Sequence, residues 1–428
     1  MRPFVRNIKM IESDGTTETL KIRDNSLRDS LLFVRDFGAD PSLDDNAPYI
    51  NAAIREASAQ HKALMFDSST YYIKSPIVIN LAYTPGADGI HPNKLVIYGN
   101  GAWIAPDHCH GIMIQGERND ENEQWLNLEL YDLTINAKGG PAYNGQDGVV
   151  FGYNPNGMMN TEGGYTMFKN VAIRYMNRAF HFLSCRHMEF IGCTADFIKE
   201  ESLCFDMAEI NPRVADLKFI GCEFNGRAGI KIHSDRAQTE GVITGIHFDD
   251  CDFYKNVLSN VVMNTYFDFT MENQIKACDI WFNNCAFDQI NGNDLFVFTN
   301  KYLYGLGPDG DHTNKMNVTP CYVGDIHICD CYIMNGKRVL NTTWADSIWF
   351  SGNMVHATGM PDAAHDYGEI HMSNTSNIFI TDNLLDTYLT DANPPRDCYL
   401  VSCGAHVAAN NIGATIKTAA SWPPPLNP

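Results

Sequence analysis

Six ionisable side chains occur on two short segments that share one alternating pattern of apolar and polar residues. They are Asp206 and Glu209 in SLCFDMAEI, and Lys231, His233, Asp235 and Arg236 in AGIKIHSDR. Alternation is typical of a β-strand with one buried face. If Phe205 and Ile232 point inward, then Asp206 and His233 point outward from neighbouring strands. The sequence therefore predicts a cluster of titratable groups on the outer surface of one sheet.

A pair of carboxyl groups in this cluster suits the hydrolysis of a glycosidic bond. Hydrolysis requires one protonated and one ionised carboxyl group beside the bond that breaks. Asp206 with Asp235, or Glu209 with Asp235, can form such a pair, and repulsion between neighbouring carboxylates favours the protonated form of one of them. The candidate catalytic residues are therefore Asp206, Glu209, Asp235 and His233.

β-Elimination from a uronic acid is a second chemistry that the same cluster permits. It needs a base, for which His233 or Lys231 is suited, and a cation beside the substrate carboxylate, for which Arg236 is suited. The formal net charge of −20 repels an anionic substrate, and this favours hydrolysis over elimination. A protein that binds a glycan on this surface without cleaving it is the third alternative.

Other side chains near the cluster are suited to hold a sugar chain. Long insertions, such as the one from Asn300 to Pro320, leave the regular pattern as loops, and loops on a rigid scaffold concentrate binding residues. Their tyrosine rings can stack on sugar rings. The candidate substrate-binding residues are Lys231, Arg236, Asn264, Tyr266, Tyr302 and Tyr304. No metal site and no cofactor is predicted.

A repeated phrase must position these residues. An apolar residue, any residue, a second apolar residue, two small or polar residues and then Cys or Asn occur in this order seven times between Met188 and Leu385. The sixth positions are Cys193, Cys222, Cys251, Cys285, Cys331, Asn353 and Asn383, at spacings of 29, 29, 34, 46, 22 and 30 residues. Such a period, interrupted by longer insertions, indicates a solenoid. Because the residues alternate within each unit, the units are strands and the solenoid is a parallel β-helix.

The two residues before each Cys or Asn predict a sharp bend. They are rich in Gly, Asp and Asn, which accept left-handed backbone angles. The Cys or Asn that follows is expected at one corner of every coil. There, stacked Asn side chains can hydrogen-bond from coil to coil, and stacked Cys fills the same small space. Weaker copies, such as LELYDLTI and HVAANNIG, extend the stack to about eleven coils at the ordinary strand spacing of ~4.8 Å.

One elongated body with short additions at its ends is the expected organisation. We predict an N-terminal arm (1–33), an opening module with a capping helix (34–104), the parallel β-helix (105–416) and a C-terminal tail (417–428). The helix is expected to begin near Asp45 or Asn46, with Pro48 in its first turn. An apolar stripe on it would cover the open end of the solenoid, and its members are Tyr49, Ile50, Ala53, Ile54 and Ala57.

The segment from Phe33 to about Ile104 carries a series of motifs. They are GAD, an Asp-Asp pair before a short helix, a strand, a Thr-Tyr pair and a second strand. The series resembles the opening module of the pectate-lyase-like superfamily of single-stranded right-handed parallel β-helices, although FDSSTY stands where the family usually shows Pro and Gly before the Tyr. Together with the N-terminal arm, the chain resembles bacteriophage tailspike and capsule depolymerase proteins. The signatures of a polygalacturonase are absent.

The resemblance implies an all-β, right-handed parallel β-helix that acts on a polysaccharide of the bacterial surface, such as a capsule, an O-antigen or an exopolysaccharide. It also implies a homotrimer on the virion tail, attached to the tail or baseplate through residues 1–33. The sequence itself shows no heptad stretch, and the short segment after the last coil leaves no large C-terminal module for trimerisation.

Several other classes of protein are disfavoured by composition. The acidic charge argues against nucleic acid and against anionic membrane surfaces as partners, and no stretch approaches the ~20 apolar residues of a membrane span. The start, MRPFVRNIKMIESDG, lacks the apolar region of a signal peptide, which argues against a secreted plant-wall lyase. We therefore expect assembly in a host cytoplasm, and reduced cysteines.

Overall fold

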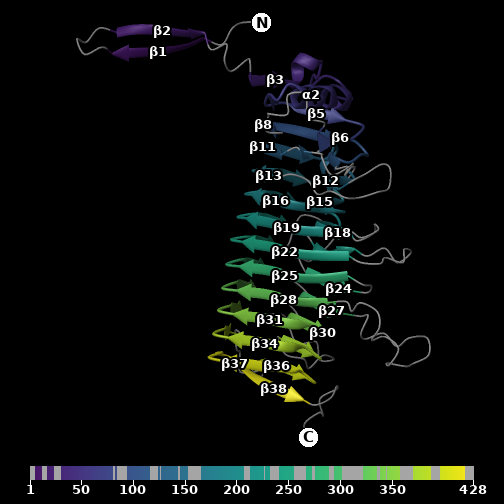
Figure 1. Ribbon diagram of the computed structural model, residues 1–428, viewed down its shortest axis with the longest axis vertical. Coiled ribbons are helices and arrows are strands. Elements are labelled where there is room, and N and C mark those ends of the chain that lie inside the picture. Colours follow the sequence, from purple (N-terminus) through teal and green to yellow (C-terminus); the bar gives the residue numbers. More distant parts are fainter. Residues whose placement is uncertain are drawn as a thin grey trace, which may run out of the picture.

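The computed structural model describes residues 5–11, 17–23, 30–80, 82–83, 94–115, 124–125, 127–142, 145–152, 165–206, 213–225, 227–231, 241–254, 267–271, 275–288, 294–300, 322–334, 338–343, 345–356, 370–386 and 396–419. Most of these residues wind as a right-handed parallel β-helix, with its first coils at one end of a long axis and its last coils at the other (Figure 1). The fold class expected from the repeat is confirmed.

A twelve-stranded sheet forms one wall of the solenoid, and each of its strands pairs in parallel with the strand of the next coil. In order along the axis, the strands are β6 (Ile77–Asn80), β9 (Ile112–Gln115), β12 (Asp147–Phe151), β15 (Arg178–Phe182), β18 (Glu201–Asp206), β21 (Arg227–Lys231), β24 (Phe267–Met271), β27 (Asp294–Asn300), β30 (Arg338–Thr343), β33 (Ile370–Ser373), β36 (Arg396–Val401) and β38 (Ala414–Ala419).

A second parallel sheet, the corner sheet, contains the strands on both sides of one corner. Two long strands, β8 (Lys94–Pro106) and β11 (Asn127–Asn136), run through the corner. The strands before it are β3 (Leu31–Phe33), β4 (Ala63–Met65), β13 (Thr166–Lys169), β16 (Cys185–Ile191), β19 (Arg213–Ile220), β22 (Gly241–Asp249), β25 (Ile275–Asn283), β28 (Tyr322–Cys329), β31 (Asp346–Ser351), β34 (Ser376–Thr381) and β37 (His406–Ala409). Those after it are β5 (Thr70–Ile73), β14 (Ala172–Arg174), β17 (Thr194–Asp196), β20 (Glu223–Asn225), β23 (Asp252–Tyr254), β26 (Ala286–Asp288), β29 (Tyr332–Met334), β32 (Met354–His356) and β35 (Leu384–Asp386).

The remaining described elements are short. Two pairs of strands are antiparallel: β1 (Val5–Ile11) with β2 (Thr17–Arg23), and β7 (Ala82–Tyr83) with β10 (Gln124–Trp125). Two single turns of 3-10 helix, η1 (Val34–Phe37) and η2 (Gly140–Ala142), complete the set together with the helix α2 (Ala47–Ala59).

The repeated phrase aligns residue for residue from coil to coil. Met188 pairs with Leu217, which pairs in turn with Ile246. The same register continues through Ile280 as far as Ile378. Since a slip by one residue would turn every apolar side chain outward, burial of the alternate residues fixes this register.

The corner of each coil has the backbone that the sequence predicts. A left-handed residue stands at the bend in successive coils, namely at Asn100, Asp132, Asn170, Gly192, Gly221, Asp250, Asn284, Asp330, Gly352, Asp382 and Asn410. From Asp132 onward, the residue that follows the bend points into the solenoid, and Cys251 and Asn353 are there 0% and 1% exposed. The predicted corner column is confirmed, whereas the number of complete coils stays a prediction.

Stacked phenylalanines fill the interior behind the corner. The rings of Phe190, Phe219, Phe248 and Phe282 lie one above another, with centroid separations of 4.7, 4.8 and 5.0 Å between successive rings. All four are fully buried. Burial of each ring contributes roughly 2 to 3 kcal/mol, and each stacked pair adds about 1 kcal/mol. The core therefore gains stability coil by coil along one dimension.

Helix α2 covers the N-terminal end of the solenoid (Figure 1). Its buried residues are Ala47, Ile50, Ala53, Ile54 and Ala57, so most of the expected stripe is confirmed. Tyr49 was wrongly included, because its side chain is 39% exposed. Asn46 occupies the cap position without capping, since its side chain bonds to Asp40 and Tyr72 instead. Asp45 accepts the N–H of Ala47 at 3.1 Å.

Candidate active site

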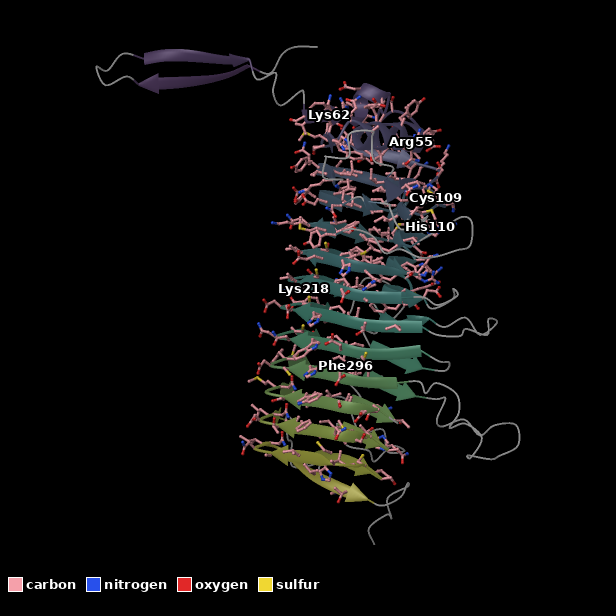
Figure 2. The ribbon with its side chains drawn as sticks, viewed as in Figure 1. Arg55, Lys62, Cys109, His110, Lys218 and Phe296 are labelled. Atoms are coloured by element: carbon pink, nitrogen blue, oxygen red, sulfur yellow. The ribbon has the colours of Figure 1, made fainter. Side chains whose placement is uncertain are left out.

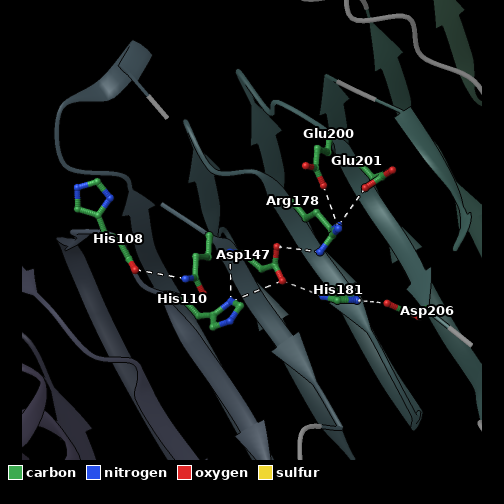
Figure 3. Close-up of polar contacts among 9 residues, drawn as sticks. His108, His110, Asp147, Arg178, His181, Glu200, Glu201 and Asp206 are labelled. Atoms are coloured by element: carbon green, nitrogen blue, oxygen red, sulfur yellow. Dashed lines mark hydrogen bonds and ion pairs between the residues drawn. The ribbon is translucent and has the colours of Figure 1, made fainter. Parts of the chain in front are cut away.

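A network of buried charges crosses three neighbouring strands of the twelve-stranded sheet, β12, β15 and β18 (Figure 3). The register of the sheet assembles it, because Asp147 pairs with Arg178, and His181 pairs with Cys204, two residues before Asp206. Adjacent strands lie ~4.8 Å apart, within the reach of side chains that leave the same face. His110, which joins the network, and Lys218 of the corner sheet lie at opposite sides of the solenoid (Figure 2).

His181 lies between two aspartates at the centre of this network. Its Nδ1 is 2.8 Å from Asp147 Oδ2, and its Nε2 is 3.2 Å from Asp206 Oδ2. Burial by itself lowers the pKa of His181, but the hydrogen bonds to Asp147 and Asp206 outweigh it and raise the pKa to about 11. The ring is therefore an imidazolium at neutral pH, and both nitrogens donate to carboxylates.

Arg178 joins the same network to two glutamates. Its Nη1 is 3.4 Å from Asp147 Oδ1, its Nη2 is 2.9 Å from Glu200 Oε2 and its Nε is 3.1 Å from Glu201 Oε2. Burial would raise the pKa of Asp147, but the hydrogen bond from His181 and the charges of His181 and Arg178 lower it overall. Asp147 is therefore an ionised carboxylate whose two oxygens bind two different cations.

His110 forms the most N-terminal part of the network. The backbone N–H of Asp147 donates to His110 Nδ1 at 3.2 Å, so in the neutral ring the proton lies on Nε2. Burial lowers the pKa of His110, against the attraction of Asp147. Its side chain remains 28% exposed. At neutral pH His110 is therefore an uncharged donor at the edge of the network.

The network lies outside the main core, yet it is sheltered. Met113, Val150 and Leu183 form a small apolar cluster that is separate from the core, and Val150 pairs with His181 on the next strand. The residues Asp147, His181 and Asp206 are only 4%, 7% and 4% exposed. Charges in such surroundings interact more strongly than they would in water. A titratable group perturbed by burial and by specific charged partners is a candidate functional residue.

One predicted site residue, Asp206, belongs to this network, but its expected neighbour was wrong. Asp206 pairs with Lys231, where the sequence alignment placed His233. The sequence alignment was therefore shifted by two residues along the second strand. A shift of two residues keeps the predicted face of the sheet but changes which residue lies beside Asp206. The other predicted catalytic residues, Glu209, His233 and Asp235, lie outside the described residues.

The side chains of the predicted substrate-binding residues also lie outside what the structure describes. Lys231 is the last residue of β21, and only its backbone is described. The others, which all lie outside the described residues, are Arg236, Asn264, Tyr266, Tyr302 and Tyr304. In the coil that holds Asn264 and Tyr266, the strand of the twelve-stranded sheet is β24, which begins at Phe267.

Sequence reasoning missed Asp147, Arg178 and His181. They lie in coils whose corner residues are not Cys or Asn, so the repeated phrase did not align those coils with the later ones. A signal was present in RAFHF and DGVVF, which have the length and apolar content of ESLCF. Aligning those three segments would have placed His181 beside Cys204, near Asp206.

Metal sites and membrane-spanning helices are both lacking in the part of the chain that the structure describes. No group of three or more His, Cys, Asp and Glu side chains there is placed to hold a metal ion. No helix among the described elements is long and apolar enough to span a membrane. Every cysteine within the described ranges is a free thiol.

Comparison with known proteins supports the fold. No family model and no curated protein sequence matches the chain. Among solved structures, the A-module of a mannuronan C-5 epimerase from Azotobacter vinelandii is similar, with a TM-score of 0.51 and 16% identity over 92% of this chain and 99% of that chain. At this identity the similarity is one of fold alone.

Two further structures match at lower scores. The surface adhesin PfbA of Streptococcus pneumoniae has a TM-score of 0.45 and 11% identity, over 91% of this chain and 93% of that chain. The tailspike protein of the E. coli bacteriophage HK620 has a TM-score of 0.43 and 10% identity, over 98% of this chain and 80% of that chain.

Proposed function

We propose that this protein is a polysaccharide depolymerase that hydrolyses a glycan of the bacterial surface at the outer side of the twelve-stranded sheet. The observation that supports it is the buried chain of Asp147, His181 and Asp206 outside the core. A gain in folding stability does not account for these three buried charges, because replacing buried ion pairs by packed apolar residues is often neutral or stabilising. A solenoid also offers an elongated wall that suits a long polymer.

Asp206 would supply the ionised half of the carboxyl pair. A carboxylate that accepts a hydrogen bond from an imidazolium is favoured in its charged form, and hydrolysis needs such a carboxylate as base or nucleophile. The carboxylate takes a proton from the attacking water, or attacks the sugar itself, while a carboxylic acid gives its proton to the leaving oxygen. Glu209 or Asp235 would provide that acid.

The charges of the network favour hydrolysis over elimination. Elimination needs a cation that can neutralise the carboxylate of a uronic acid. Among the described residues, Arg178 binds three carboxylates and His181 binds two. The network contains two more carboxylates than cations, so an anionic sugar would be repelled. An enzyme of similar fold, the mannuronan C-5 epimerase named above, acts on a polymer of uronic acid, and elimination therefore stays the alternative to be tested.

A non-catalytic glycan-binding protein is the second candidate. It is favoured by the mutual pairing of His181 and Arg178 with carboxylates, since groups that satisfy one another's charges need take no part in a reaction.

We further propose a homotrimer on the virion tail, attached through residues 1–33. Light scattering of the purified protein would test the trimer, and deletion of residues 1–33 would test attachment to virions.

Cleavage of a panel of capsule and O-antigen polysaccharides tests the function directly. Hydrolysis adds the mass of water to the products, whereas elimination leaves an unsaturated sugar, so mass spectrometry of the released oligomers separates the two.

Asp206→Asn should lower the rate of cleavage by a factor of about 100 or more while binding of the polysaccharide persists. Asp216→Asn is the matched control, because Asp216 lies beside Arg186 and His187 at 3.9 and 3.4 Å but is 47% exposed. Binding without cleavage by the unmodified protein would favour the second candidate.

A further inference from the structure

We propose that Asp147 is a positioning residue that holds His181 in place and, through its ring, orients the carboxylate of Asp206. This inference deepens the proposed hydrolase function and rests on it for the role of Asp206. Asp147 and Asp206 lie on β12 and β18, on either side of β15, and cannot pair with each other directly through the sheet. The imidazole of His181, on the strand between them, bridges the two carboxylates.

The geometry fixes the ring from several sides. Nδ1 of His181 bonds to Asp147 at 2.8 Å, and Nε2 bonds to Asp206 at 3.2 Å. Asp147 is itself held, because its other oxygen, Oδ1, is 3.4 Å from Arg178 Nη1. The two remaining nitrogen groups of Arg178 bind glutamates, so the guanidinium cannot turn without breaking three ion pairs. Asp147 therefore transmits a fixed orientation from Arg178 to His181.

Among the described residues, the titratable and charged groups placed against His181 belong to this arrangement. They are Asp147 on β12, Arg178 on β15, Cys204 and Asp206 on β18, and His110 before β9. Two of them are carboxylates bonded to the ring. Removal of the charge of Asp147 would leave one carboxylate to hold the proton, in surroundings where burial opposes it. Above its lowered pKa the ring would be neutral, and one of its nitrogens could then only accept a hydrogen bond.

Titration of His181 by NMR tests the proposal without any substrate. In the unmodified protein the ring should remain protonated throughout pH 6 to 9, as its pKa of about 11 requires. In Asp147→Asn the midpoint should fall by about one to three pH units, the usual effect of one neighbouring opposite charge. Asp206→Asn should produce a similar fall, which checks the bridge from its other side. The resonance is assigned by its loss in His181→Gln.

The matched control is Asp216→Asn, which removes a carboxylate from another histidine and arginine pair. It should leave the titration of His181 unchanged. If His181 in the unmodified protein titrates near its ordinary pKa of about 6.5, or if Asp147→Asn leaves its midpoint in place, the proposal is overturned. A circular dichroism spectrum like that of the unmodified protein shows that each variant is folded.

The dependence of cleavage on pH separates this proposal from the function on which it rests. With the unmodified protein, loss of His181 protonation should not limit the rate below about pH 9. Asp147→Asn should acquire an alkaline decline in kcat/KM at the pH where its His181 titrates. A decline at the same pH in both proteins would overturn the positioning role. If no polysaccharide is cleaved, the hydrolase proposal fails, while the titration still decides whether Asp147 holds the protonated ring.

Discussion

The corner column of the solenoid consists of two chemically different parts. From Cys193 to Cys331 the corner residue is a cysteine, and from Asn353 to Asn411 it is an asparagine. Each thiol lies near one backbone carbonyl of the coil before, such as Cys222 Sγ at 3.4 Å from Phe190 O. Each amide does more: Asn353 Oδ1 accepts the N–H of Cys331 at 2.9 Å, while its Nδ2 donates to Ile328 O at 2.8 Å.

The interior behind the corner also changes along the stack, although Ile328 and Ile333 already flank the last cysteine, Cys331. Behind Cys222, Cys251 and Cys285, phenylalanines occupy the core positions on both sides of the corner, as with Phe248 and Phe253. Behind the asparagines, most of these positions hold aliphatic residues such as Ile380 and Leu385. The cysteine part therefore derives its stability mainly from stacked rings, and the asparagine part derives more of it from hydrogen bonds. The comparison shows that one coil geometry can be stabilised in two ways.

Phe248→Ala should have the largest effect, because it removes a ring stacked at 4.8 Å on Phe219 and at 5.0 Å on Phe282. We expect a loss of about 3 to 5 kcal/mol, measured as increased hydrogen exchange in the coils around residue 248. Ile380→Val, at the equivalent position in the asparagine part, should cost only about 1 kcal/mol. If the two losses were equal, the phenylalanine stack would have no special role.

Asn383→Ala should follow, because Asn383 is the middle member of the amide ladder. The change leaves Phe350 O without its donor and removes the acceptor of two N–H groups of Asn353. Buried groups left without partners cost about 1 to 3 kcal/mol each, so we expect a loss of about 3 kcal/mol in chemical unfolding. Asn283→Ala is the control, since its amide bonds to Asp249 at 3.5 Å on the exposed face. The ladder would be unimportant if the two changes cost the same.

Cys251→Ala, in the cysteine part, should have a smaller effect than Asn383→Ala. The thiol donates weakly to Phe219 O at 3.5 Å and to Asp249 O at 3.4 Å, and it provides no acceptor comparable to an amide oxygen. We expect a loss of about 1 kcal/mol in the same unfolding experiment. A loss as large as that of Asn383→Ala would mean that thiols and amides stabilise the corner equally. The asparagine corner would then gain nothing extra from its hydrogen bonds.

Alkaline pH should weaken the cysteine corner more than the asparagine corner, and this should be the smallest of the expected effects. Burial raises the pKa of the Cys285 and Cys193 thiols well above the ordinary value. Hydrogen bonds with Cys222 and Cys285, together with burial, also raise the pKa of Cys251. A raised pKa in the folded state contributes stability that is fully present below the unfolded pKa, near 9, and is lost as pH rises above it. Unfolding midpoints from pH 7 to 10.5 should therefore fall less steeply for Cys251→Ala. Equal slopes for the variant and the unmodified protein would contradict this.

The sequence allowed the fold to be predicted because the same physical constraint recurs in every coil. Each unit must bury alternate residues and then turn sharply, so the pattern around Gly192 reappears around Asp382. The capping helix followed from its apolar stripe, and only Tyr49 was misplaced. A stripe predicts which face is buried, but not how much of a large ring at its edge remains exposed.

The candidate site could be predicted only in part, because it depends on register between strands that carry no signature. Asp206 was identified from its own segment, but its neighbour on the next coil depends on how many residues each turn contains. Turn length varies freely where the chain leaves the stack. His181 was missed for the same reason: its role arises from Asp147 and Asp206, which lie 34 and 25 residues away.

The uniform register of the corner sheet makes the length of this molecule adjustable. Ile348 pairs with Ile326 on one side and with Ile378 on the other, at matching positions of the three strands. A coil can therefore be duplicated or removed by joining equivalent positions, and the neighbours on each side would meet the same partners as before. Gene segments that encode one coil can thus change the reach of the protein by ~4.8 Å at a time, several coils away from His181.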